Sequence, residues 1–178
     1  MVVSNRVRFL VWIILVGGGV AASLYLDGLF GWSCPRIPCI IAGIILLGII
    51  LRAAAVTGRY LAVYGKSSSG KGFGEVDRLV TVGPYSCMRH PMHFYLSLLP
   101  IAIGLIIGSP TYTLIIGPVE TVLILVMAVT IDERESVERF GEQYIEYKKK
   151  VKAFNLNPKC LAKALAKRPP KQQPSSRM

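Results

Sequence analysis

The chain has 178 residues, 52% of them hydrophobic, and carries a formal net charge of +11. An apolar body with a basic remainder favours an integral membrane protein over a soluble domain, because the apolar runs are too long for a soluble core to bury. The charges flank apolar segments instead of covering a soluble face, which argues against a nucleic-acid-binding protein.

Two apolar segments near the N-terminus predict two membrane helices. Residues 9–26 contain no charged side chain and lie between arginines and an aspartate. Because no convincing small-residue cleavage site follows, we interpret them as a retained membrane helix and not as a signal peptide. Residues 37–51 form the second run, which reaches spanning length at Val56 if Arg52 extends toward the lipid headgroups.

Residues 57–92 are polar and rich in glycine, and predict an irregular loop of the kind that often carries function. Within it, residues 65–71 have the glycine and lysine spacing of a phosphate-binding loop. The lysine is followed by Gly72 instead of Ser or Thr, and no buried strand precedes the segment. We therefore interpret it as a flexible basic loop and not as a nucleotide site.

Residues 93–107 and 111–131 predict two further membrane helices, joined by a turn short enough for a tight hairpin. The second helix contains a lone carboxylate, Glu120. An ionisable residue at membrane depth is a functional hypothesis, so we expect Glu120 to face the bundle interior or a substrate tunnel, or to pair with Arg52. The fold class predicted is an all-α, multi-pass transmembrane bundle of about four helices, with five as the alternative.

Lysine and arginine are concentrated on one side of this predicted topology. The loop at 57–92 and the segment after Ile131 are rich in them, whereas the loop at 27–36 contains only Arg36 and the hairpin turn contains none. The positive-inside rule therefore places both termini and the middle loop in the cytoplasm. We expect a multi-pass protein of the cell membrane, or of the endoplasmic reticulum if the source is eukaryotic.

The four cysteines make no metal-binding pattern. Cys34 and Cys39 bracket two prolines, and we expect them to be free, partly buried thiols, with a disulfide as the alternative if their loop faces an oxidising compartment. Cys87 and Cys160 carry no signal of their own.

Residues 132–154 have the pattern of one amphipathic helix. Apolar residues recur at spacings of three and four, and extending this stripe backward by one step reaches Glu133. A carboxylate therefore heads an apolar face where the last membrane helix ends, either as an inward-facing group or as an acidic residue favoured at a helix N-terminus. Beyond Pro158, residues 159–167 could lie on anionic lipid, and residues 168–178 have a disordered composition.

Two motifs carry a family resemblance. Residues 79–92 read LVTVGPYSCMRHPM, and Asp132-Glu133 is followed by FGEQYIEY at 140–147. Together they resemble the two signatures of the isoprenylcysteine carboxyl methyltransferase and phospholipid methyltransferase superfamily. These integral membrane enzymes hold S-adenosylmethionine at the cytoplasmic membrane face without a Rossmann fold.

The resemblance implies a set of site residues. The implied cofactor-binding residues are Leu79, Val80, Tyr85, His90, Pro91, Met92, His93, Asp132 and Glu133. The candidate catalytic residues are Arg89, Glu133 and Arg139. Asp132 or Glu133 would take the ammonium of the cofactor, and Arg89 would orient a carboxylate of cofactor or substrate or would anchor a lipid headgroup. The motifs do not separate the two acids.

Some positions depart from the family pattern. His93 stands where many members have tyrosine, Asp132 replaces a glutamate, and Ser136 replaces a leucine. Residues 119–131 also lack the arginine that eukaryotic carboxyl methyltransferases use for their substrate. This last departure weighs against a prenylcysteine carboxylate as the acceptor.

The resemblance implies an S-adenosylmethionine-dependent methyltransferase, with S-adenosylhomocysteine as product, acting on a lipid-like or prenylated acceptor. The first candidate reaction is O-methylation of an isoprenylcysteine-like carboxylate, and the alternative is N-methylation of a phospholipid or other lipid amine. A membrane reductase or a non-catalytic scaffold is less favoured. We divide the chain into N-terminal membrane helices (1–56), a methyltransferase core (57–157) and a basic, flexible tail (158–178).

Overall fold

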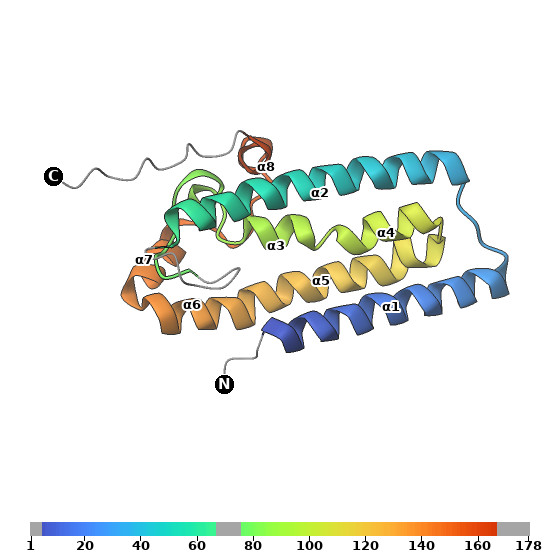
Figure 1. The fold of residues 1–178 in the computed structure, drawn as a ribbon, viewed down its shortest axis with the longest axis horizontal. Coiled ribbons are helices and arrows are strands. Elements are labelled where there is room, and N and C mark those ends of the chain that lie inside the picture. Colours follow the sequence, from blue (N-terminus) through green and yellow to red (C-terminus); the bar gives the residue numbers. More distant parts are fainter. Residues whose placement is uncertain (1–4, 67–75, 167–178) are drawn as a thin grey trace. The chain divides into compact units, whose positions relative to one another are not determined.

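The structure is a computed structural model that describes residues 5–66 and 76–166, with side chains described from Leu10 onward. Most of the segment with phosphate-loop spacing and the tail after Ala166 lie outside the described residues. Within those ranges the chain is helical and has no β-strand, which confirms the all-α class (Figure 1).

Three helical segments are long and apolar enough to cross a membrane: Leu10–Phe30, Arg36–Tyr64 and Tyr112–Phe140. The fourth predicted crossing corresponds to a shorter apolar stretch, Pro91–Ile107, which is divided after Leu96. The second half of this stretch begins at Leu99 and has Pro100 in its first turn, where a missing N–H costs nothing.

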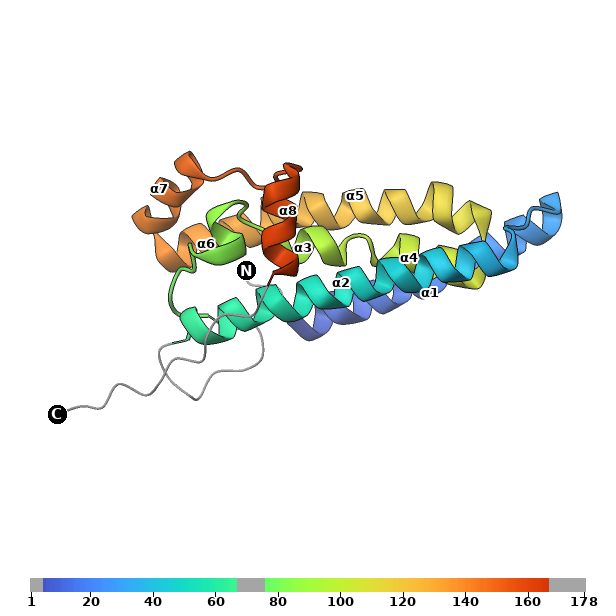
Figure 2. The same ribbon diagram turned by 90° about the horizontal axis from the view of Figure 1, so that it is seen from above.

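The first compact unit contains residues 1–50 and 95–130. In Figures 1 and 2, α4 lies between α5 and the N-terminal part of α2. The elements of this unit are α1 (Asn5–Phe30), the start of α2 (Arg36–Tyr64), α4 (Leu99–Ile107), the π-helical η2 (Tyr112–Ile116) and α5 (Gly117–Met127).

A buried carboxylate fixes the hairpin turn of this unit to α1. Asp27 is 7% exposed, and its Oδ1 accepts hydrogen bonds from the backbone N–H of Thr111 at 3.1 Å and from the Thr111 hydroxyl at 2.5 Å. The Ser109 hydroxyl donates to Oδ2 of the same carboxylate. Because these donors lie at the start of the second hairpin helix, Asp27 sets where that helix begins.

We expect Asp27→Ala to destabilise the bundle by roughly 2–4 kcal/mol, because it leaves three buried donors without an acceptor. Thermal unfolding in detergent measures the effect. Asp27→Asn, which keeps one carbonyl acceptor, should lose less. An alanine variant as stable as the wild type would contradict this role.

Glu120 faces the interior of the first unit. It is 4% exposed, and its Oε2 accepts a hydrogen bond of 2.9 Å from the Tyr112 hydroxyl. A Cβ on Gly19 of α1 would lie 2.7 Å from Glu120 Oε1, so a larger residue at this close helix contact would displace the Glu120 carboxylate. Of the alternatives for Glu120, an interior position is confirmed, while Arg52 instead donates to the carbonyls of Leu165 and Ala166.

The second compact unit contains residues 51–94 and 131–178. Helix α8 (Pro158–Leu165) is seen nearly end-on next to α2 in Figure 1 and runs across the direction of α2 in Figure 2. The other elements are the 3-10 turn η1 (Gly83–Ser86), α3 (Pro91–Leu96), the π-helical η3 (Ala128–Asp132), α6 (Glu133–Phe140), α7 (Glu142–Lys150) and α8 (Pro158–Leu165).

Three expectations about this unit need correction. The loop predicted at 57–92 begins later, because α2 continues to Tyr64, and it contains η1 and the start of α3. The single helix predicted at 132–154 is broken at Gly141, whose φ of 56° ends α6, and helix α7 ends at Lys150. The division at 57 and 158 stays a prediction, but the start of the segment assigned to a flexible tail is helix α8.

The expectation that Cys34 and Cys39 are free thiols is wrong, and the alternative of a disulfide between them is confirmed. Cys34 and Cys39 form a disulfide with their Cα atoms 6.4 Å apart. The chain turns back where α2 begins, and the N–H of Cys39 donates to the carbonyl of Pro35 at 3.1 Å, which brings the two residues within disulfide range. Cys87 and Cys160 form a second disulfide, between residues 73 positions apart.

Candidate active site

A glycine turn positions the Arg-His-Pro segment. Gly83 has a φ of +62°, which favours glycine, and it lies against the ring of Tyr60, so a Cβ at this position would collide with the ring. After η1, the N–H groups of Arg89 and His90 donate to the carbonyls of Lys152 and Ala153, at 2.9 and 3.2 Å. The motif is therefore held along the extended segment that follows α7.

Glu133, the second of the two acidic residues, lies in an ionic cluster with Arg89. Glu133 is 3% exposed, and its Oε1 accepts from Arg89 Nε at 3.0 Å and from Nη2 at 2.5 Å. Lys148 Nζ contacts Oε2 at 2.5 Å, and His90 Nε2 lies 3.3 Å from Oε1. One carboxylate is thus compensated by two permanent cations, as a buried charge requires.

Arg89 also binds the end of α7. Its Nη1 donates to the carbonyl of Val151 and, at 3.3 Å, to that of Lys148. The planar guanidinium therefore joins α6 to the C-terminal carbonyls of α7, a geometry that a lysine cannot reproduce. In this structure Arg89 is a positioning residue that holds Glu133.

The other acid of the pair has different surroundings. Asp132 Oδ2 lies 3.1 Å from His93 Nε2, and the two side chains are 22% and 43% exposed. Glu133 points inward, as the helical stripe predicted, while Asp132 is partly exposed. The structure thereby distinguishes the two acids that the motifs left equivalent.

Burial and the neighbouring His93 lower the pKa of His90 to about 4 from 6.5. His90 is therefore neutral at pH 7, with Nε2–H placed to donate to Glu133.

This depressed pKa predicts a pH dependence of stability. Between about pH 6.5 and 4 the unfolded chain binds a proton at this site and the folded chain does not, so stability falls on acidification by about 3 kcal/mol. Melting temperatures of the wild type should fall through this window, and those of His90→Gln should fall less. Equal slopes for the two proteins would contradict the assignment.

A tyrosine of the motif has an unpaired buried hydroxyl. Tyr85 is 6% exposed, and its hydroxyl has no hydrogen-bond partner among the residues that the structure describes. Its carbonyl accepts from the hydroxyl of Tyr147, which fixes the η1 turn to α7. Burial raises the pKa of Tyr85 above its ordinary value, so the hydroxyl remains protonated as a buried donor.

The remaining predicted site residues are not among the described hydrogen-bond partners of Glu133. Within the first motif, Val80 and Pro91 are buried, and Leu79 and Met92 are half-buried. Arg139 is outside the Glu133 cluster, because its Nη1 donates to the Val76 carbonyl at 3.1 Å on an exposed part of α6. Sequence reasoning missed Lys148, which belongs to a run of three lysines that gives no sign of which one turns inward.

Fold and site define a multi-helix membrane protein with a buried ionic cluster built from two distant motifs. The family model described as phospholipid methyltransferase matches residues 37–143, more than half of the chain. The chain therefore belongs to the phospholipid methyltransferase family, and the resemblance to this superfamily of membrane methyltransferases is confirmed. Comparison with curated proteins and with solved structures found no match.

Proposed function

We propose that the protein transfers the methyl group of S-adenosylmethionine to an amphiphilic acceptor that enters from the lipid. The observation that carries this proposal is the meeting of the Arg-His-Pro segment with Glu133, 43 positions from His90, in one buried cluster inside the matched family region. A membrane reductase or a non-catalytic scaffold is less well supported, because the family is one of methyltransferases.

The residues present fit this cofactor. S-adenosylmethionine supplies an electrophilic methyl group on a sulfonium, and its ammonium group needs a carboxylate. Asp132, which pairs with His93, is the more exposed carboxylate of the two and is the one we assign to the ammonium, while Glu133 is buried against Arg89 and Lys148. The unpaired hydroxyl of Tyr85 offers a hydrogen bond to a polar group of the nucleoside, and Leu79 and Val80 offer apolar surface for adenine.

The protein's own contribution is positioning and exclusion of water. Backbone hydrogen bonds to Lys152 and Ala153 and the hydrogen bonds of the Arg89 guanidinium hold the motif in place. A rigid site is what the in-line arrangement of methyl donor and acceptor requires. No proton has to be removed from a carboxylate acceptor, and a group with the low pKa of His90 is a weak base.

These features favour an isoprenylcysteine-like carboxylate as the acceptor. The net positive charge of the Arg89, Glu133 and Lys148 cluster also suits an anionic acceptor. A phospholipid amine is the second candidate, because the family model carries that description.

Transfer of radiolabelled methyl from S-adenosylmethionine tests the proposal. Purified protein is given a farnesylated cysteine derivative or vesicles containing phosphatidylethanolamine. Label in a base-labile methyl ester supports the carboxylate, and label in a stable N-methyl lipid supports the amine. Folded protein that binds S-adenosylhomocysteine and labels neither acceptor would overturn both acceptor assignments.

A further inference from the structure

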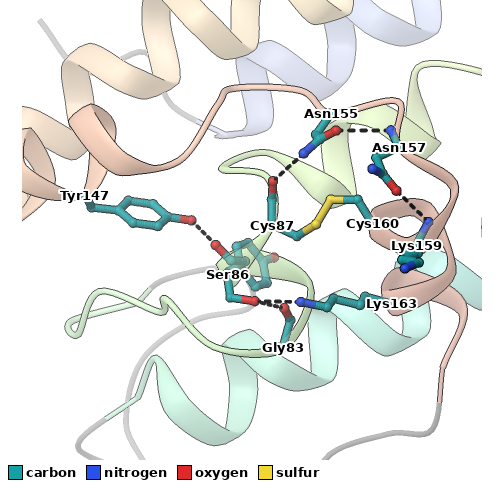
Figure 3. The surroundings of a disulfide bond; sticks show 10 residues. Gly83, Ser86, Cys87, Tyr147, Asn155, Asn157, Lys159, Cys160 and Lys163 are labelled. Carbon is teal, nitrogen blue, oxygen red and sulfur yellow. Dashed lines mark hydrogen bonds between the residues drawn. A yellow bond between two sulfur atoms is a disulfide. The ribbon is translucent and has the colours of Figure 1, made fainter.

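The Cys87–Cys160 disulfide joins the Arg-His-Pro motif to a helix outside the matched family region. Cys87 lies two residues before Arg89, and Cys160 is in the first turn of α8. Figure 3 shows the bond among Ser86, Asn155 and Lys163, which come from the motif, the extended segment and α8. The family match ends at residue 143, so this link belongs to the C-terminal part of this chain.

Besides the disulfide, α8 contacts the described part of the chain through small buried side chains and exposed polar groups. Its buried side consists of Cys160, at 1% exposure, and Ala164, at 0%, and an alanine contributes little apolar area. Lys163 Nζ lies 3.3 Å from Ser86 Oγ at an exposed position, and Arg52 donates to the carbonyl groups that end the helix. A helix of eight residues is not stable alone, so α8 depends on its tertiary contacts, among which the disulfide is the covalent one.

The helix is continuous with the segment that holds the site. Asn157 caps the start of α8, and Asn155 Nδ2 donates to the Cys87 carbonyl at 3.4 Å. Only a few residues earlier, Lys152 and Ala153 accept the N–H groups of Arg89 and His90. Release of α8 would therefore loosen the segment against which the motif is ordered.

The predicted topology places the two disulfides in different redox conditions. Cys39 lies at the start of α2, which is long enough to cross a membrane, and Cys87 follows its end. One crossing thus separates the two bonds, and the distribution of Lys and Arg predicts that Cys87 and Cys160 face the cytoplasm. Disulfides in that compartment are usually transient or redox-sensing, whereas those on the opposite side persist.

We propose that Cys87 and Cys160 form a reversible redox-modification site that controls the order of the cofactor site, with a cellular dithiol as the reductant. The proposal rests on the methyltransferase site described above. A thiolate of the dithiol attacks the sulfur of Cys87, which is half-buried, and expels the thiolate of the buried Cys160, which takes up a proton. The second thiol of the reductant then displaces Cys87. The dithiol ends as a disulfide, and both cysteines end as thiols.

The test compares the full-length protein in oxidised and in reduced dithiothreitol. Alkylation followed by mass spectrometry reports the thiol state, hydrogen exchange reports the order of residues 85–95 and 151–166, and calorimetry reports the affinity for S-adenosylhomocysteine. Reduction should speed exchange in both segments and weaken binding by at least about fivefold. Cys87→Ser with Cys160→Ser should resemble the reduced wild type in either buffer, whereas Cys34→Ser with Cys39→Ser should respond like the wild type.

The proposal is overturned if alkylation shows that Cys87 and Cys160 are reduced while exchange and affinity stay unchanged. It is also overturned if both cysteines are alkylated without reductant. A protein that binds S-adenosylhomocysteine in neither state, but whose exchange responds to reduction, would remove the methyltransferase assignment and leave the redox site standing.

Discussion

Replacement of Glu133 by alanine is expected to destabilise the second unit by about 3–5 kcal/mol and to abolish binding of S-adenosylhomocysteine. The carboxylate is the shared partner of Arg89 and Lys148, and Arg89 is 9% exposed in its side chain. Without Glu133, the buried guanidinium of Arg89 loses its counter-charge. The link that Arg89 makes between α6 and the end of α7 is then broken on the α6 side.

Thermal unfolding and calorimetry in the same detergent measure the two effects. Glu138→Ala is the matched control, because Glu138 lies on the same helix with a 54% exposed side chain in an ion pair with Arg134. Such surface pairs contribute at most about 1 kcal/mol. If the Glu133 and Glu138 variants were equally stable, the cluster would not be the structural centre of the site.

Arg89→Lys is expected to reduce methyl transfer about 100-fold although the charge is kept, because small displacements of a positioned group have effects of this size. The guanidinium contacts Glu133 through two nitrogens and the α7 carbonyls through a third, and one ammonium cannot span these partners.

Separate measurement of KM and kcat makes the prediction for Arg89→Lys specific. Since Arg89 acts by holding Glu133 and the end of α7, both KM for S-adenosylmethionine and kcat should change in Arg89→Lys. Lys148→Ala, which removes a half-exposed cation from the same carboxylate, should have a smaller effect on both. An Arg89→Lys variant with the KM and kcat of the wild type would show that the guanidinium contacts are not required.

The sequence predicted the elements that repeat a simple pattern. The long apolar runs gave the membrane helices, and the spacing of apolar residues gave the inward direction of Glu133. The motifs predicted that Arg89 and His90 lie close to Glu133, although 44 positions separate Arg89 from that carboxylate.

Other features depend on tertiary contacts that no local pattern encodes. The carbonyls at the end of α7 can accept hydrogen bonds from Arg89 because the helix ends at Lys150. Gly141 interrupts a stripe that looks continuous in the sequence, and Cys87 meets Cys160 only after the chain returns along the motif. The partner of each acid likewise follows from packing, not from its place in the Asp132-Glu133 pair.

The most direct test of the central claim is calorimetric titration of the folded, detergent-purified protein with S-adenosylhomocysteine, comparing wild type, Asp132→Asn and His90→Ala. We expect micromolar binding by the wild type and a loss of at least about tenfold in Asp132→Asn, the size expected for a hydrogen bond to a charged group. The melting temperature of Asp132→Asn should change little, because Asp132 is partly exposed. His90→Ala should bind more weakly as well. No binding by wild-type protein that is shown to be folded would contradict the cofactor site and the function built on it.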